Sequence, residues 1–182
     1  MYGTAPMGGL NGDGVVYELS PSGSGWSERT IHDFSGSDGI FPQAGLIFDG
    51  SGNLYGAAAG GGSQQGGNVY RLTPSSNGQW TETVLYMFSG ADGNYPVAQL
   101  TFDAVGSLYG TTLFGGAHNE GVAFKLTPSA GTWSYSRLHD FTAPGNGQNP
   151  YGKVVVDAAG NVYGTTVSGG AEDSGVVWEI TP

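Results

Sequence analysis

A repeat of 53 or 54 residues constrains the fold of this 182-residue chain more than any other feature of its sequence. The dipeptide Tyr-Gly recurs with spacings of 53, 54 and 54 residues, and a further glycine follows twelve residues after each tyrosine. The repeated tyrosines are Tyr2, Tyr55, Tyr109 and Tyr163. A fixed period of this length is typical of units that pack against their neighbours, so residues 1–182 are expected to form a single repeat array.

The segments between these motifs match as well. Each holds a tryptophan, a phenylalanine eight residues later, an Asp-Gly or Asn-Gly pair, a proline four residues after that Asp or Asn, and an apolar run ending in aspartate. In the second such segment these residues are Trp80, Phe88, Asp92, Pro96 and Asp103. So many ordered matches define one structural unit rather than scattered similarities.

Each complete unit predicts four short strands, a to d, which in the second unit cover residues 44–49, 53–58, 68–73 and 80–88. Strand a recurs at 98–103 and 153–157. Turn residues bound every run, and no helical period is present. Four antiparallel strands in every ~50 residues are typical of a β-propeller blade. A β-solenoid is the alternative, but its repeats are usually shorter.

The expected fold is therefore all-β, with about three and a half blades of four antiparallel strands. Residue 1 takes a strand b position and residue 182 follows strand c, so we expect partial blades over 1–36 and 153–182 and full blades over 44–88 and 98–141. A closed propeller needs at least four complete blades. We therefore expect an incomplete propeller that self-associates through open strand edges or is completed within a longer parent chain.

Composition excludes several classes of function. The net charge of −10 argues against nucleic acid as a partner, since that surface requires Lys and Arg. The absence of cysteine removes disulfides and thiolate sites. No apolar run approaches the ~18 residues of a membrane span, so membrane insertion is not expected. We expect no organic cofactor.

The run from Leu108 to Pro128, with its Tyr-Gly-Thr-Thr, Gly-Gly and Val-Ala-Phe-Lys-Leu-Thr-Pro strings, resembles the GloVer tandem repeat. The element from Asp157 to Tyr163 is similar to those of NHL-type and gluconolactonase-like propellers. The resemblance covers essentially the whole chain, departing at Ala57-Ala58 and Ser107. It implies propeller-like blades in a bacterial, exported repeat protein, and thus an extracellular or cell-surface location. It carries over no catalytic residue.

One aspartate ends strand a in every repeat, which gives Asp49, Asp103 and Asp157. A ring of carboxylates is one hypothesis, because Ca²⁺ prefers oxygen ligands. The alternative is that each aspartate accepts backbone N–H groups and fixes the turn into strand b. Because every repeat carries it, we favour the turn.

The connectors and the Gly-rich loops supply the candidate ligand-binding residues. An Asx-Gly pair and nearby aromatics could hold a sugar, or could be a turn stiffened by proline. The long Gly-rich loops keep their glycines but differ in polar residues from repeat to repeat, and such variable positions can encode ligand specificity. The candidates are Asp38, Asp92, Asn146, Phe41, Tyr95, Tyr151, His118 and Glu120.

Two further patterns favour structural roles. Trp26, Trp80 and Trp133 open strand d at matched positions, which predicts packing between blades rather than a carbohydrate platform. His32 precedes Asp33, as in a proton relay. Adjacent strand residues point to opposite faces, so these two side chains are not expected to share a hydrogen bond.

No asymmetric catalytic constellation emerges from the sequence, and catalysis usually requires one. The expected function is a non-catalytic binding or surface-structural module, with glycans as the candidate ligand. The alternative is a carbohydrate-active or lactone-type hydrolase or lyase with its site at the axial opening of the propeller, which rests on analogy between folds.

Overall fold

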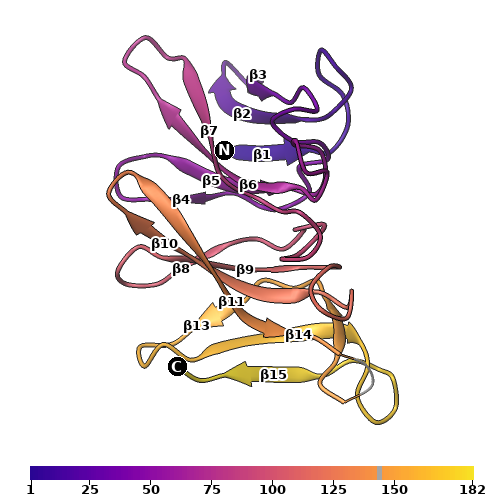
Figure 1. The fold of residues 1–182 in the computed structure, drawn as a ribbon. Helices are drawn as coiled ribbons and strands as arrows, with labels where there is room; N and C mark the ends of the chain where they lie inside the picture. The colour runs from indigo at the N-terminus through magenta and orange to yellow at the C-terminus, as the bar shows by residue number, and fades with distance from the viewer. Residues whose placement is uncertain (143–144) are drawn as a thin grey trace.

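Strands form all the regular secondary structure of the computed structural model, which describes residues 1–142 and 145–182. Four antiparallel sheets follow one another from the top to the bottom of Figure 1. Each sheet is one copy of the repeat, and we number them blades 1 to 4. Over the described residues they do not close into a ring, so the prediction of an all-β, incomplete propeller is confirmed. None of these residues lies in a helix long and apolar enough to cross a membrane.

The strands follow the repeat in order. Blade 1 contains β1 (Tyr2–Ala5), β2 (Val15–Ser22) and β3 (Gly25–Asp33). Blade 2 contains β4 (Ile47–Phe48), β5 (Leu54–Ala58), β6 (Asn68–Pro74) and β7 (Trp80–Met87). Blade 3 contains β8 (Thr101–Phe102), β9 (Leu108–Thr112), β10 (Val122–Ser129) and β11 (Thr132–Asp140). Blade 4 contains β12 (Gln148–Pro150), β13 (Val155–Val156), β14 (Val162–Ser168) and β15 (Val177–Ile180).

The first strand of the blades is shorter than predicted. The strand expected over 44–49 is reduced to β4, and β8 and β13 are equally short. Carbonyl groups of this segment bond instead to neighbouring blades: Thr4 Oγ1 donates to Ala44 O at 3.3 Å, and Gln99 Nε2 donates to Leu46 O at 3.1 Å. The segment thus ties successive blades together rather than extending its own sheet.

One strand was not predicted. Residues 148–150 form β12, which pairs with Ser168 and Thr166 of β14. In blades 2 and 3 the same part of the connector makes only single bridges, Ile40 with Gly60 and Asn94 with Phe114. The connector therefore adds to the edge of the next blade in every repeat, and in blade 4 that contact is long enough to become a strand.

Glycine follows each repeated tyrosine because an aromatic ring of the next strand lies over it. A Cβ atom at Gly110 would lie 2.7 Å from Cζ of Phe124. Gly56 faces the ring of Tyr70 in the same way. The Tyr-Gly motif that marks the repeat is therefore a packing requirement of the blade.

Each junction between blades holds an apolar cluster. Between blades 1 and 2, Val16 and Phe34 pack with Leu54, Tyr70 and Leu72. Equivalent clusters lie at the other two junctions. We call the face of a blade that meets the preceding blade its leading face, and the face that meets the following blade its trailing face.

A β-bulge occurs at the same place in blades 1, 2 and 3. The register of the last two strands shifts by one residue after Val16, after Val69 and after Ala123. One extra residue turns the following side chain to the opposite face of the sheet. The residues turned to the trailing face, opposite Val16, Val69 and Ala123, are His32, Tyr86 and His139.

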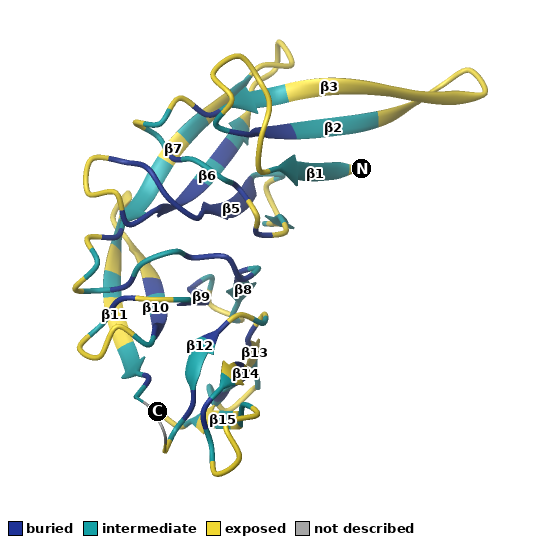
Figure 2. Ribbon diagram, turned by 90° about the vertical axis from the view of Figure 1, so that its right-hand side faces the viewer, coloured by how far each residue is buried: buried dark blue, intermediate teal, exposed yellow. Residues whose placement is uncertain are grey.

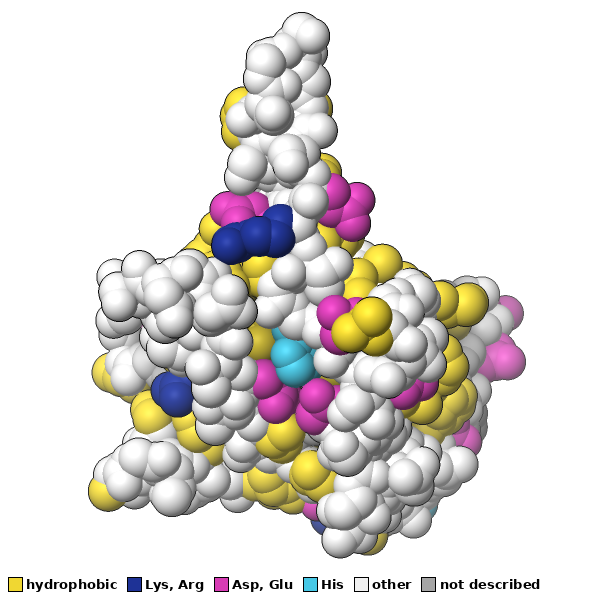
Figure 3. Space-filling view, turned by 90° about the horizontal axis from the view of Figure 1, so that it is seen from above, with side chains coloured by type: hydrophobic (Ala, Val, Ile, Leu, Met, Phe, Trp, Pro, Cys, Tyr) yellow, Lys and Arg dark blue, Asp and Glu magenta, His cyan; other side chains and the backbone are white. Residues whose placement is uncertain are grey.

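The β2–β3 hairpin of blade 1 projects from the body of the molecule. Residues 21–30 are all exposed, and the hairpin extends to the right in Figure 2 and upward in Figure 3. In Figure 2 the sheets follow a curve, with β7 and β11 on its outer side. The projecting hairpin is held to blade 2 near its base, where Nη1 of Arg29 donates a hydrogen bond to Gly78 O at 3.0 Å.

Candidate functional site

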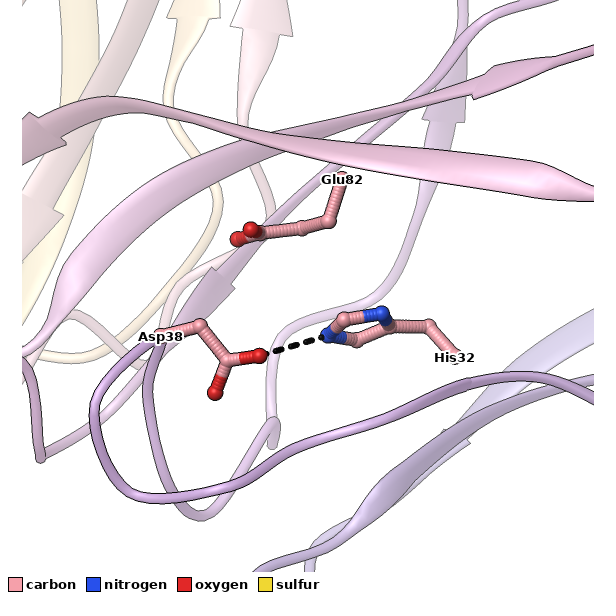
Figure 4. Close-up of side chains that lie close together, drawn as sticks. All are labelled: His32, Asp38 and Glu82. Carbon is pink, nitrogen blue, oxygen red and sulfur yellow. Dashed lines mark ion pairs between the residues drawn. The ribbon is translucent and has the colours of Figure 1, made fainter.

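Side chains from three elements meet at the junction of blades 1 and 2. His32 comes from β3, Asp38 from the connector and Glu82 from β7. The bulge turns His32 toward blade 2, and Glu82 lies opposite Leu72 on the leading face of blade 2. One nitrogen or oxygen atom of each side chain lies within 4.8 Å of the other two. Figure 4 shows the three side chains converging.

The connector turn orients Asp38. Its Oδ1 accepts hydrogen bonds from N and Oγ of Ser35 at 2.8 and 3.1 Å, and its backbone oxygen accepts one from Nδ2 of Asn68 at 2.5 Å. Its other carboxylate oxygen, Oδ2, lies 3.2 Å from Nε2 of His32. One oxygen therefore fixes the turn, while the other faces the imidazole.

Burial shifts the ionisation of both partners of Asp38. It lowers the pKa of His32, although the carboxylates of Asp38 and Asp33 oppose that effect. Burial, with a smaller contribution from the charge of Asp38, raises the pKa of Glu82 to about 7. Oε1 of Glu82 is buried without a hydrogen-bond partner, and the only partner of the buried Nε2 of His32 is the Asp38 carboxylate. The protein around this cluster thus leaves one carboxylate oxygen unsatisfied.

The junction of blades 2 and 3 uses the same three repeat positions differently. The hydroxyl of Tyr86 donates to Oδ2 of Asp92, and that of Tyr135 donates to the backbone oxygen of Asp92 at 2.6 Å. The two tyrosine rings stack with centroids 4.5 Å apart and planes at 12°. None of these polar side-chain atoms is buried without a partner. This junction is closed by hydrogen bonds and stacking.

The junction of blades 3 and 4 contains a third variant. Oδ1 of Asn146 accepts a hydrogen bond from N of Thr142 at 2.8 Å, which repeats the connector turn. Its Nδ2 lies 2.9 Å from Nε2 of His139. The predicted ligand residues Asp38, Asp92 and Asn146 are therefore equivalent turn residues at three junctions, and each also meets the side chain at the bulge.

The aromatic candidates do not form one equivalent set. Phe41 and Tyr95 both precede a proline and have positive φ values of 55° and 65°. The residue that repeats them is Asn149, with φ of 57°, rather than Tyr151. Tyr151 is 52% exposed, and the hydroxyl of Tyr95 accepts a hydrogen bond from Nε2 of Gln43 at 3.4 Å. Their common feature is the strained backbone before proline, not a shared aromatic surface.

The two loop candidates lie in the Gly-rich loop of blade 3. His118 is exposed. The backbone oxygen of Glu120 accepts a hydrogen bond from N of Asn149 at 2.8 Å, so Glu120 helps to hold the next connector. The structure does not bring either side chain to the cluster of His32, Asp38 and Glu82, which is the only group of three or more metal-ligating residues within 1–142 and 145–182.

The aspartates nominated as Ca²⁺ ligands make the turn contacts that the alternative predicted. Asp49 accepts hydrogen bonds from N of Ser51, from N and Nδ2 of Asn53 and from the hydroxyl of Tyr55, at 2.7–3.0 Å. Asp103 and Asp157 repeat the pattern, and the Lys125 ammonium lies 3.7 Å from Asp103. Each carboxylate is thus occupied within its own blade.

Matched grooves lie between successive blades. The groove between blades 2 and 3 measures about 390 Å³ and includes Asp49, Tyr55, Arg71 and Trp133 in its lining. The groove between blades 3 and 4 measures about 380 Å³ and includes Asp103, Tyr109 and Lys125 at the corresponding positions. Each groove combines a carboxylate, a phenol and a basic side chain.

The trailing face of blade 4 is open. Val177 in β15 is 82% exposed. The residues at the same position of the other blades, Val16, Val69 and Ala123, are at most 1% exposed, because the next blade covers them. Blade 4 therefore presents part of the surface that forms an interface in blades 1 to 3, where the last strand of the blade also contributes to it.

The leading face of blade 1 is open in the same way. Met1 is 70% exposed, whereas its equivalent Leu54 is fully buried. Trp26 is 61% exposed. Its equivalent Trp80 packs edge-on against Tyr2 of the preceding blade, with ring centroids 5.8 Å apart. The prediction that the repeated tryptophans pack between blades is thus confirmed for Trp80 and Trp133, but not for Trp26 within this chain.

Sequence reasoning missed the cluster because it compared His32 with its neighbour in sequence, Asp33. In the structure Asp33 accepts a hydrogen bond from N of Leu10 at 2.9 Å, and His32 faces Asp38. The signal was present in the repeat: His32 and Glu82 stand where the next junction has Tyr86 and Tyr135. Two coincident changes to titratable residues mark this junction as different.

Comparison with known proteins defines the family. No protein of curated function matches the chain. The family model of the Gloeobacter/Verrucomicrobia repeat matches residues 1–182, the whole sequence. The match agrees with the repeat period, the Tyr-Gly motif and the four-stranded blades described above. The chain belongs to the Gloeobacter/Verrucomicrobia repeat family.

Proposed function

We propose that this chain is a non-catalytic structural module that assembles through its two end faces, with a second copy of the chain docked head to tail. The observation that carries the proposal is the exposure of Val177, at 82%, against at most 1% for Val16, Val69 and Ala123 at the same repeat position. A small apolar residue that lies in an interface in three blades is suited to the same use in the fourth.

The leading face of blade 1 is the matching half of such an interface. It carries Met1 and Trp26 at positions where blades 2 and 3 insert residues against the preceding blade. In a head-to-tail dimer Trp26 of one copy would pack on Tyr163 of the other, as Trp80 packs on Tyr2 and Trp133 on Tyr55. The two ends match at these positions because both derive from one repeat, although blade 1 lacks the first strand of the repeat and blade 4 lacks the last. The alternative is that further repeats of a longer parent chain cover the same two faces.

The test is the mass of the chain in solution, measured by light scattering and sedimentation over a range of concentrations. We expect a concentration-dependent dimer or longer assembly. Val177→Asp should weaken it by about 2 kcal/mol, or about 30-fold in Kd, since it loses the burial of a valine side chain. Val105→Asp, at an 80% exposed position of blade 3, is the matched control and should leave assembly unchanged. A wild-type chain that stays monomeric at high concentration contradicts the proposal.

A second candidate function, glycan binding, is favoured by the two matched grooves. Their volumes fall within the range of about 300–1,000 Å³ typical of small-molecule sites. The Trp133 ring and the Arg71 guanidinium in the first groove suit stacking on a sugar and donation to its hydroxyl groups. Binding of oligosaccharides on a glycan array that is lost in Arg71→Ala would support it. Equal signals from Arg71→Ala and the parent chain would count against it.

The extracellular location stays a prediction of the family resemblance. The hydrolase alternative requires carboxylates from dissimilar positions gathered at the axial opening. The cluster of His32, Asp38 and Glu82 instead combines the last strand of blades 1 and 2 with the connector. A panel of glycosidase and lactonase substrates tests the alternative, and turnover abolished by a single Asp→Asn change would favour it over a structural module.

A further inference from the structure

We propose that His32, Asp38 and Glu82 bind one divalent transition-metal ion of the Zn²⁺ class at the junction of blades 1 and 2. This inference does not depend on the assembly through the end faces. It rests on the donor set, on an unsatisfied buried carboxylate oxygen and on a comparison with the next junction.

The donor set is that of a transition-metal site. Imidazole nitrogen and carboxylate oxygen are both Zn²⁺ ligands, at about 2.0–2.2 Å from the metal. At that distance, neighbouring ligands of a tetrahedral ion lie about 3.3 Å apart. Nε2 of His32 and Oδ2 of Asp38 lie 3.2 Å apart, so these two atoms already have the spacing of a shared metal. One carboxylate oxygen of Glu82 lies within 4.8 Å of a ligand atom of each of these residues, so Glu82 would have to move closer to complete the site.

The second observation is that one ligand atom lacks a protein partner and another has a single one. Oε1 of Glu82 is buried without a hydrogen-bond partner, and Nε2 of His32, also buried, has no partner besides Oδ2 of Asp38 at 3.2 Å. Buried polar groups are nearly always satisfied, and each unsatisfied one requires an explanation. The unsatisfied oxygen of Glu82 and the His32–Asp38 contact near it are explained together if all three side chains are ligands of one ion.

The charge of the cluster favours a cation. Two carboxylates and one imidazole face one another, and within 1–142 and 145–182 no Lys or Arg side chain lies within 4.0 Å of Asp38 or Glu82. Buried carboxylates are costly unless they are paired or coordinate a metal. The side chains of His32 and Asp38 are 15% and 22% exposed, so the cluster is not sealed from solvent.

The junction of blades 2 and 3 is the internal control. At the same three positions, Tyr86 and Tyr135 satisfy Asp92 by hydrogen bonds and leave no polar atom without a partner. The backbone of the repeat therefore needs no metal at this position. The site exists because the preceding junction has His32 and Glu82 where this junction has two tyrosines.

The type of ion follows from the ligand count. Three protein ligands, one of them an imidazole, leave a fourth tetrahedral position open for water. Ca²⁺ takes six to eight oxygen ligands, so this site should bind it poorly. Mg²⁺ prefers octahedral oxygen ligands and should also bind poorly.

The experiment is calorimetric titration of the full chain, free of any polyhistidine tag and treated with a chelator, with Zn²⁺, Ca²⁺ and Mg²⁺ in separate runs. We expect one Zn²⁺ per chain and no saturable binding of Ca²⁺ or Mg²⁺. Co²⁺ should give visible absorption bands of a tetrahedral site. Absence of saturable Zn²⁺ binding, or a Ca²⁺ affinity equal to that for Zn²⁺, would overturn the proposal.

The decisive variant is the double substitution His32→Tyr with Glu82→Tyr, which installs the residues of the next junction and so keeps the fold. It should lower Zn²⁺ affinity by more than about 100-fold, because changes behind the ligands alone cost about 10–100-fold. His118→Ala removes an exposed histidine and serves as the control, with affinity unchanged. Equal Zn²⁺ binding by the double variant and the parent chain would refute the site, and circular dichroism checks that both are folded.

Discussion

The junction of blades 1 and 2 and the junction of blades 2 and 3 share a backbone but differ in chemistry. At both, a buried phenylalanine begins the connector, a bulge turns one side chain to the trailing face, and an aspartate fixes the turn with a serine. At the first junction the remaining positions are His32 and Glu82, and at the second they are Tyr86 and Tyr135. The repeat specifies the frame, and the frame tolerates different side chains at two positions.

The difference shows where a repeat protein can acquire function without losing its fold. Structural contacts, such as Phe88 in its apolar cluster, recur because every blade needs them. The residues after the bulge and on the facing strand are half-buried, and the connector turn holds the backbone whatever side chains they carry. Single junctions can therefore change while the array is unaffected.

The largest effect should come from removing the buried phenylalanine that both junctions have. Phe34→Ala and Phe88→Ala each remove a side chain that is at most 1% exposed, and each should cost about 3–5 kcal/mol of unfolding free energy. Chemical denaturation measures both. If the two junctions share one frame, the two losses agree within about 1 kcal/mol. A large difference would show that the polar groups around the connector, not the frame, determine the stability of the junction.

Exchange of the variable positions should have the next largest effect. Tyr86→His with Tyr135→Glu breaks two hydrogen bonds and a stacked ring pair, and should destabilise the metal-free chain by about 2–4 kcal/mol. Thermal melts with and without Zn²⁺ provide the measurement. Zn²⁺ should recover part of the loss if the three positions suffice for a metal site.

The matched control for that exchange is the reverse one at the first junction. His32→Tyr with Glu82→Tyr removes the unsatisfied buried oxygen of Glu82 and installs the tyrosines that satisfy the aspartate at the next junction, so in metal-free buffer it should be neutral or stabilising. Loss of stability in this variant, together with no loss in Tyr86→His with Tyr135→Glu, would mean that the frames of the two junctions differ after all.

The frame could be predicted from the sequence because it repeats. The matched tyrosines, prolines and Asx-Gly pairs gave the blades, the strand order and the turn roles of Asp49, Asp103 and Asp157, and the contacts agree. The length of the first strand was wrong, because Ala44 and Leu46 bond to side chains of other blades, which no local pattern reveals.

The cluster of His32, Asp38 and Glu82 could not be predicted by the same reasoning. Its members are separated by up to 50 residues and belong to two blades. Their meeting depends on the bulge before His32, which changes the face of that residue and is not visible in the alternation of polar and apolar residues. Phe41, Tyr95 and Tyr151 were grouped by residue type, whereas φ groups Phe41 and Tyr95 with Asn149.

The smallest expected effect concerns Asp92, which occupies at the second junction the repeat position that Asp38 occupies at the first. Burial alone would raise the pKa of Asp92, but hydrogen bonds from Tyr86 and Ser89 outweigh it and leave the pKa below its ordinary value of about 3.9. A lowered folded-state pKa stabilises the fold above about pH 4, and this contribution is lost as the pH falls through the folded-state value. Stability should therefore decline in acid below about pH 4.

Tyr86→Phe isolates that contribution, because it removes the phenol hydroxyl and keeps the ring that stacks on Tyr135. It should cost about 1 kcal/mol at pH 7, and the difference from the parent chain should narrow below about pH 4, where Asp92 becomes protonated. Denaturation midpoints measured from pH 7 to pH 2 test this. A difference in stability between the variant and the parent chain that stays constant with pH would mean that the hydroxyl does not act through the Asp92 carboxylate. Arg137, which donates a hydrogen bond to Ala91 O of the connector, is unchanged in the variant.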